Sequence, residues 1–119
     1  MSELSPSEHD AILAMVSHLP HLIAYSYMHA IANQDLGAQA LHYAGSGFRD
    51  FTRIAASHPA IWTDVSFANQ DSLLQLIDAQ QQELQRLKDL ILAGDAQALY
   101  AYYDQAQQQR DAWPPQPVQ

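Results

Sequence analysis

The sequence predicts an all-α protein, and composition, hydrophobic spacing and helix-capping signals each support this class. The 119 residues include only three valines and two threonines, whereas alanine, leucine and glutamine are abundant. Residues that favour helices therefore outnumber those that favour strands. Apolar residues recur three and four positions apart along most of the chain, as in helices with one buried face. The length suits one domain with a core of its own.

The longest predicted helix covers about residues 6–32. Ser5, Pro6 and Glu8 fit a capping box with proline at the first helical position. Its apolar positions continue on both sides of Pro20, and they are Ile12, Leu13, Val16, Leu19, Leu22, Ile23 and Ile31. An internal proline removes one backbone hydrogen bond and bends a helix without always ending it. We therefore expect one long helix that is bent near Pro20.

Three short helices are predicted in the middle of the chain, at about residues 36–43, 48–57 and 60–67. A turn with two glycines, Gly45 and Gly47, precedes the second of them, and glycines there can adopt a positive φ. Pro59 separates the second helix from the third, because the residue before a proline avoids the helical conformation.

Two long helices are predicted in the C-terminal part. The first begins at a cap formed by Asn69 or Asp71 and ends at Gly94, and Asp95 caps the second, at about 96–112. The prolines at 114, 115 and 117 are expected to end regular structure. The two apolar stripes are Leu73, Ile77, Leu84, Leu87 and Ile91, then Leu99, Tyr102, Tyr103 and Ala106. Part of this apolar surface is expected to face a second copy of the chain, which predicts a homodimer.

The charge of the chain excludes several kinds of partner. The net charge is −8 and only five residues are lysine or arginine, namely Arg49, Arg53, Arg86, Lys88 and Arg110. Nucleic acids and anionic membrane surfaces require more basic residues than this. No apolar run reaches the roughly 18 residues of a membrane span, and no signal peptide is evident, so we expect a cytoplasmic protein. The chain has no cysteine, which excludes disulfides and thiolate chemistry.

A group of histidines marks the first candidate site. Ser17 and His21 are four residues apart and share a helix face, with His18 at its edge. His9 lies about two turns earlier on a similar face. Each histidine can be structural or can bind a polar ligand near neutral pH. The chain has no Glu-x-x-His pair, so the sequence predicts no metal site.

The second candidate site lies in the segment from Gly45 to Ile54. Arg49 and Arg53 are four residues apart, and Asp50 is placed to pair with Arg53. This pattern fits either surface ion pairs at a helix start or an arginine clamp for a carboxylate. Trp62, which follows, fits either a core position or a pocket wall.

Motifs of other enzyme classes are missing from the sequence. It contains no GxGxxG or Walker A motif for nucleotides and no GxSxG motif for a serine nucleophile.

Four blocks in order resemble the C-terminal helical domain of prephenate and arogenate dehydrogenases. They are His9-Asp10, Ser17-His18-Leu19-Pro20-His21, Gly45 to Ala55, and Trp62. The resemblance implies an intertwined dimer and oxidative decarboxylation of prephenate to 4-hydroxyphenylpyruvate with NAD or NADP, a step of tyrosine biosynthesis. It also implies that the catalytic base and the cofactor site belong to an N-terminal Rossmann domain that residues 1–119 lack.

The resemblance further assigns roles to individual residues. His21 and Arg53 hold substrate carboxylates, Ser17, His18 and His9 lie nearby, Asp50 orients or gates Arg53, and Trp62 lies against the pocket. Ser46 stands where the family usually has glycine. The ligand is prephenate or arogenate, with tyrosine as a candidate inhibitor. The chain then binds substrate and dimerises but is inactive without a Rossmann domain on the same or a separate chain.

Two alternatives remain. The chain could be a stand-alone helical dimer module that binds prephenate or tyrosine without catalysis. It could also be a helical enzyme of the chorismate mutase type, but such enzymes surround a dicarboxylate with more cations than this sequence supplies and have no use for the HLPH block.

Overall fold

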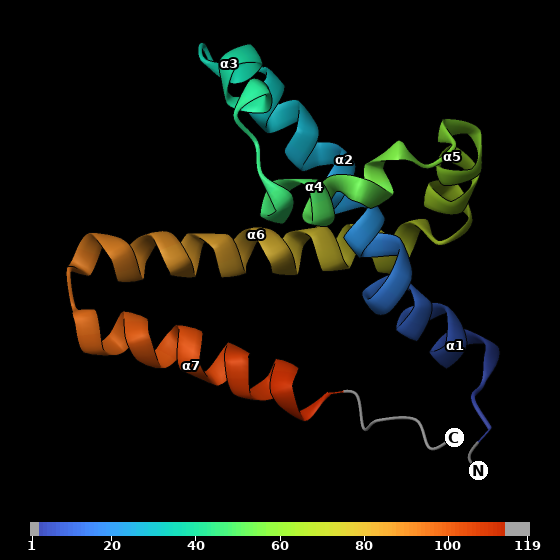
Figure 1. Ribbon diagram of the computed structural model, residues 1–119. Coiled ribbons are helices and arrows are strands. Elements are labelled where there is room, and N and C mark those ends of the chain that lie inside the picture. The colour runs from blue at the N-terminus through green and yellow to red at the C-terminus, as the bar shows by residue number, and fades with distance from the viewer. Residues whose placement is uncertain (1–2, 114–119) are drawn as a thin grey trace, which may run out of the picture. The chain divides into compact units, whose positions relative to one another are not determined.

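A computed structural model describes residues 3–113, and all regular structure in that range is helical (Figure 1). The predicted all-α class is therefore confirmed. The prolines expected to end regular structure lie outside the described residues. The contacts divide the chain into two compact units, Met1–Asp78 and Ala79–Gln119, and each is treated by itself below.

The N-terminal helix of the first unit continues past Pro20, as predicted. It consists of α1 (Pro6–Leu13), a π-helical turn η1 (Ala14–His18) and α2 (Leu19–Ala32), which follow one another without a break (Figure 1). Pro20 lies in the first turn of α2. Proline lacks the N–H that a regular helix would use, and the wider π turn before it absorbs the irregularity. The expected simple kink is therefore replaced by a π segment.

The predicted capping box at the start of α1 is confirmed. The Glu8 backbone N–H donates to Ser5 Oγ at 3.2 Å, and the Ser5 N–H donates to Glu8 Oε1 at 3.0 Å. The bond that the Ser5 backbone donates lowers the pKa of the Glu8 carboxyl, since it favours the charged form.

The three short helices occur where they are predicted, with changes at their ends. They are α3 (Gly37–His42), α4 (Ser46–Thr52) continued by the 3₁₀ turn η2 (Arg53–Ala56), and α5 (Pro59–Ala68). The positive φ suggested for the glycine turn is wrong. Gly45 is the extended N-cap of α4, with φ −102°, and Gly47 is helical. Within the described range, positive φ occurs at Gly94 alone.

The core of the first unit forms where the N-terminal helix meets the start of α6 (Gln70–Ala93). Ala14, Leu19 and Leu73 are buried there, and the partly buried side chains around them are Leu22, Ile23, Leu76 and Ile77. Burial of a leucine such as Leu73 contributes about 2 kcal/mol. This packing holds in place the segments η1 and α2, which carry His18 and His21.

The second unit is a helical hairpin made by the end of α6 and by α7 (Ala96–Ala112). Gly94 has φ 68°, and Asp95 Oδ1 accepts from the N–H groups of Gln97 and Ala98, so both predicted end signals are confirmed. The Tyr102 hydroxyl donates to Glu83 Oε2 at 2.6 Å and joins the two helices.

One expectation about membranes needs correction. The helix Pro6–Ala32, taken as 27 residues, is long and apolar enough by length and composition to span a bilayer. Ala14, Leu19 and Ala24 on this helix are nevertheless buried within the first unit. The helix also carries Glu8, Asp10 and four histidines. A single helix of this kind near the N-terminus is weak evidence for a membrane span.

Candidate functional site

Three of the predicted site residues lie together in the first unit. The His21 and Trp62 rings are stacked, with centroids 3.8 Å apart and planes at 16°. The His18 ring meets the edge of the same indole at 6.0 Å and 75°. All three side chains are half-buried. Helix α5 thus supplies an aromatic wall for two histidines of the N-terminal helix, which we call the His–Trp cluster (His18, His21 and Trp62).

The tautomer of His21 follows from its hydrogen bond. His21 Nδ1 lies 2.8 Å from the Ser17 carbonyl oxygen, one turn earlier. A carbonyl oxygen only accepts, so Nδ1 must carry the hydrogen. Nε2 is then a lone pair in the neutral ring and a charged donor in the protonated ring. Ser17 acts in this contact through its backbone, whereas the sequence had suggested only a nearby side chain.

Asn69 is a residue of the site that the sequence analysis missed. It was considered only as a helix cap, but its side-chain Nδ2 donates to the Asp10 carbonyl oxygen at 2.8 Å and lies 3.5 Å from His18 Nδ1. At the start of α6, Asn69 contributes its backbone carbonyl, which accepts a hydrogen bond from the Leu73 N–H, and not its side chain. No local pattern could have revealed this contact, because its partners lie in a distant part of the sequence.

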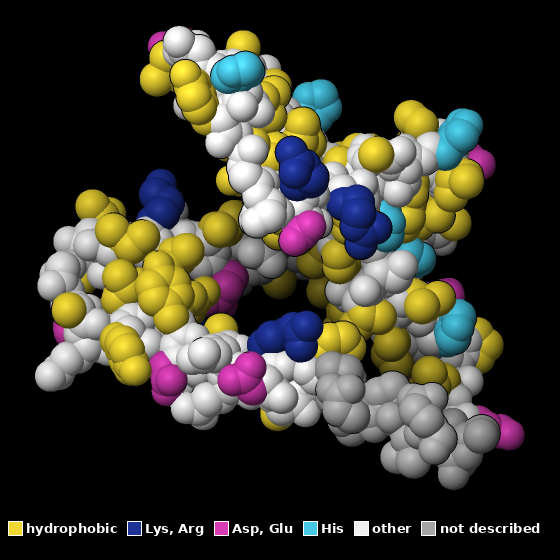
Figure 2. Space-filling view, viewed as in Figure 1, with side chains coloured by type: hydrophobic (Ala, Val, Ile, Leu, Met, Phe, Trp, Pro, Cys, Tyr) yellow, Lys and Arg dark blue, Asp and Glu magenta, His cyan; other side chains and the backbone are white. Residues whose placement is uncertain are grey.

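The arginine segment is anchored to the helix that carries His21. The Tyr27 ring lies 5.9 Å from Phe48 and 5.3 Å from Phe51, and the Tyr25 hydroxyl donates to the Ser57 carbonyl at 2.6 Å. Arg49 and Arg53 are the basic residues of this unit, and both are exposed. Figure 2 shows dark blue basic side chains close to cyan histidine side chains on the face in view.

Arg53, Asp50 and Ser46 are all exposed. Ser46 is the first residue of α4 and Arg53 the first of η2. The ion pairs among residues 3–113 are His9 with Asp10 and Arg86 with Glu83, so the suggested pair of Asp50 with Arg53 is not formed. Both side chains are therefore unrestrained by each other and open to an external ligand.

His9 does not join the cluster. Its ring is exposed, and Nδ1 lies 3.8 Å from the Asp10 carboxylate. Nine residues separate His9 from His18, which is more than about 10 Å along a helix axis. The structure connects Asp10, not His9, to the cluster, through the backbone carbonyl that Asn69 contacts.

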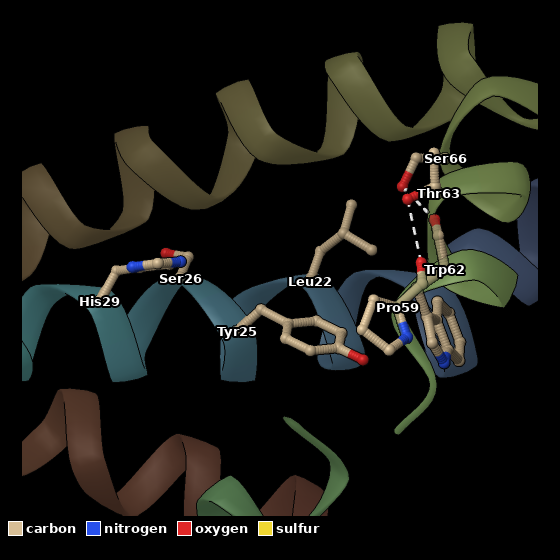
Figure 3. Close-up of a pocket in the computed structure, with 8 residues that line it drawn as sticks. All are labelled: Leu22, Tyr25, Ser26, His29, Pro59, Trp62, Thr63 and Ser66. Carbon is tan, nitrogen blue, oxygen red and sulfur yellow. Dashed lines mark hydrogen bonds between the residues drawn. The ribbon is translucent and has the colours of Figure 1, made fainter. Parts of the chain in front are cut away.

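A groove of about 400 Å³ lies beside the cluster, between α2 and α5 (Figure 3). Two stripes at helical spacing face each other across it, and they are Leu22, Tyr25, Ser26 and His29 from α2 and Pro59, Trp62, Thr63 and Ser66 from α5. Trp62 is common to this groove and to the cluster. The Thr63 and Ser66 hydroxyls donate to the Pro59 and Trp62 carbonyls of their own helix, so they are already bonded.

Residues 3–113 contain no group of three histidine, aspartate or glutamate side chains close enough to hold a metal ion. The arrangement instead offers imidazole donors, exposed guanidinium groups and an aromatic wall. Together these suit a small molecule that carries a ring and negatively charged oxygens.

Comparison with known proteins gives a consistent result. The family model described as "Prephenate dehydrogenase, dimerization domain" matches residues 5–105. Prephenate dehydrogenase of Bacillus subtilis is 36% identical over 113 residues, which cover 94% of this chain and 30% of that protein. Cyclohexadienyl dehydrogenase of Zymomonas mobilis is 33% identical over 109 residues, with 90% of this chain and 37% of that protein covered.

Solved structures agree with these matches. The arogenate dehydrogenase of Synechocystis superposes with a TM-score of 0.86 at 30% identity, over 93% of this chain and 41% of that one. Prephenate dehydrogenase of A. aeolicus, solved with hydroxyphenyl propionate and NAD+, gives 0.84 at 32% identity, over 92% and 38%. The chain thus spans well under half the length of these relatives, and the resemblance extends beyond residue 70 into the C-terminal helices.

Proposed function

Because this chain belongs to the prephenate dehydrogenase dimerization-domain family, we propose that it is the substrate-binding and dimer-forming part of such an enzyme. The reaction is the oxidative decarboxylation of prephenate to 4-hydroxyphenylpyruvate with NAD or NADP, in cytoplasmic tyrosine biosynthesis. Arogenate is the alternative substrate. The observation that carries the proposal is the His–Trp cluster, which is formed by residues from the family-like blocks.

The charge distribution supports a carboxylate ligand. The chain has a net charge of −8, so a dicarboxylate is repelled unless cations are concentrated locally. The first unit holds two arginines, both exposed on a segment that is anchored to α2. In our proposal Arg53 binds one carboxylate through paired hydrogen bonds, and protonated His21 binds the other through Nε2.

The remaining predicted residues have supporting roles in this proposal. The Ser17 carbonyl orients His21, His18 donates to the ligand, and Trp62 forms the apolar wall. Asp50 and Ser46 lie on the arginine segment and shape its approach, and His9 adds positive charge at the rim when protonated. Tyrosine, which carries a carboxylate and a phenol ring, is proposed as an inhibitor of the same site.

The described residues do not fit a nicotinamide cofactor. They contain no strand and no glycine-rich turn between a strand and a helix, which dinucleotides require. We therefore assign NAD or NADP and the catalytic base to a Rossmann domain outside these residues, on the same or a separate chain. In the alternative proposal, the chain is a non-catalytic dimer module that binds prephenate or tyrosine.

Calorimetry on the purified chain tests the proposal. Prephenate, tyrosine and hydroxyphenyl propionate should each be titrated into the wild type, Arg53→Ala and Lys88→Ala. Loss of a charged contact to a bound carboxylate weakens binding by about tenfold to a hundredfold. Arg53→Ala should show this loss, whereas Lys88→Ala removes the same charge from the second unit and should bind normally.

The same preparation distinguishes the two versions of the proposal. Addition of NAD and prephenate to the chain alone should give no reduction of NAD, and turnover should appear when a Rossmann domain of a relative is added. Binding with no rescue of turnover favours the non-catalytic module. Equal binding by Arg53→Ala and the wild type would refute the assigned carboxylate contact.

A further inference from the structure

Asn69 is held rigidly at the junction of two helices. Its backbone N–H donates to the Val65 carbonyl at the end of α5, and its carbonyl accepts from the Leu73 N–H at the start of α6, both at 3.1 Å. Its φ and ψ are −123° and 38°, between the helical and extended regions. Both backbone polar groups are thus bonded within their own segment, and only the side chain is free to reach the N-terminal helix.

The orientation of the Asn69 amide is set by its partners. Side-chain nitrogen and oxygen can be exchanged in an asparagine, but the Asp10 carbonyl oxygen at 2.8 Å accepts and cannot donate. The atom that faces it must therefore be the NH₂ group. This group has a second hydrogen, and His18 Nδ1 lies 3.5 Å away. An amide nitrogen does not accept hydrogen bonds. His18 Nδ1 can therefore take part in this contact only as an acceptor, through its lone pair.

We infer that Asn69 is a positioning residue that holds His18 as the neutral tautomer with hydrogen on Nε2. The inference rests on the proposed function for its ligand, but the contact itself does not. His21 is fixed in the opposite sense, since the Ser17 carbonyl requires hydrogen on Nδ1. The two imidazoles against Trp62 are therefore not equivalent. His18 presents an N–H donor while neutral, whereas His21 becomes a donor at Nε2 only when protonated.

This asymmetry suits a ligand with one polar uncharged group and one carboxylate. A neutral donor can bind a hydroxyl or carbonyl oxygen without adding charge, and an imidazolium favours a carboxylate. Ligands of the prephenate class carry both kinds of group. Asn69 would therefore determine that His18 binds the uncharged oxygen and His21 the carboxylate.

The test is the tautomer of His18, measured by nitrogen-15 NMR on the complete chain labelled in histidine. Asn69→Asp replaces the donor by an acceptor and should lower the ratio of Nε2–H to Nδ1–H forms by about tenfold, as expected when one hydrogen bond is reversed. Asn69→Ala should give an intermediate ratio. Exposed neutral histidine already favours Nε2–H, so the reversal in Asn69→Asp is the informative change.

The chain offers a matched control. Asn33 is followed by Gln34 and Asp35, the same tripeptide that begins at Asn69, and it is exposed. Asn33→Asp therefore makes the identical chemical change and should leave His18 as in the wild type. If the Asn69 variants fail to fold, the wild type still decides the matter, because the Asn69 side-chain amide signal should shift as His18 is titrated.

The outcomes separate this inference from the proposed function. A wild-type His18 with hydrogen on Nδ1, an unchanged ratio in folded Asn69→Asp, or an Asn69 amide signal that ignores the His18 titration would overturn the inference. Ligand binding to the wild type with any of these results would leave the proposed function standing. The expected tautomers without binding of any of the three ligands would support the Asn69 contact and contradict the proposed function.

Discussion

In the first unit, the hydrogen-bonding partners of individual ring atoms determine which nitrogen of a histidine carries the hydrogen. His21 and His18 are neighbours on one helix, yet a backbone carbonyl faces the first and a side-chain amide faces the second. The different tautomers that we infer for the two rings therefore depend on single contacts. Trp62 adds a stacked face for one ring and an edge for the other.

Gly37 gives a prediction at this scale. A Cβ at this buried position would lie 2.5 Å from the Ile31 carbonyl oxygen and 2.9 Å from that of Ala32. Both atoms belong to the backbone, so the chain must move to make room. Gly37→Ala should lower the free energy of unfolding by about 1–3 kcal/mol, as overpacking does. Urea unfolding followed by circular dichroism measures this change.

Gly47 provides the control for this prediction. It is helical, has a negative φ, and a Cβ there would meet nothing within 4 Å. Gly47→Ala should be neutral or should stabilise the protein by about 0.5–1 kcal/mol, because alanine loses less backbone entropy in a helix. Equal effects of the two substitutions would contradict the close approach at Gly37.

At the scale of secondary-structure elements, helix ends and one interhelical contact fix the geometry. The π turn η1 lets the N-terminal helix continue through Pro20. In the hairpin, the Tyr102–Glu83 bond is supplemented by Arg86, whose guanidinium carbon lies 5.2 Å from the Tyr102 ring centroid. This contact depends on the protonated phenol.

The Tyr102 hydroxyl gives a pH-dependent prediction. The hydrogen bond to Glu83, and secondarily burial and the charge of Glu83, raise the pKa of the Tyr102 phenol. Its stabilising contribution is therefore complete below the ordinary tyrosine pKa of about 10 and is lost as pH rises through the higher value of the folded state. Tyr102→Phe should be less stable than the wild type near pH 7, and the difference should shrink at alkaline pH.

Tyr103→Phe is the matched control for this experiment. Tyr103 is the next residue, and its hydroxyl has no hydrogen bond within residues 3–113. Its substitution should change neither the stability at neutral pH nor the alkaline profile by a comparable amount. Thermal unfolding at several pH values would disprove the role of Tyr102 if both variants behaved alike.

At the scale of the whole molecule, the second unit has no buried residue between positions 79 and 113. The four buried apolar residues, Ala14, Leu19, Ala24 and Leu73, all belong to the first unit. Large exposed apolar side chains of the hairpin are Leu84, Ile91, Leu92, Tyr100 and Tyr103, with exposed fractions of 51% to 80%. Two helices with such a surface are marginal in water, which supports the homodimer proposed from the family.

The chain is therefore expected to sediment as a dimer at micromolar concentration. Leu84 and Ile91 continue the apolar stripe that is buried at Leu73, but they are 52% and 55% exposed. Substitution of both by glutamine should shift the equilibrium toward monomer. Leu36→Gln, at a position that is 67% exposed in the first unit, should leave the dimer intact. A wild-type monomer at all concentrations would contradict dimerisation.

The sequence by itself determined the helices and most of their ends. The Ser5–Glu8 box, Gly94 and Asp95 were correctly predicted because caps depend on contacts between residues a few positions apart. The apolar spacing that predicts each buried face is also local. The four blocks that resemble the family could also be recognised from the sequence, because each is a short run of residues in a fixed order.

Tertiary structure alone decided how these parts meet. The His21–Trp62 stack, the groove between α2 and α5 and the Asn69 contact with His18 each join residues from distant segments. A local pattern specifies which face of a helix is apolar, but the partner of that face is chosen by the free energy of packing the whole chain.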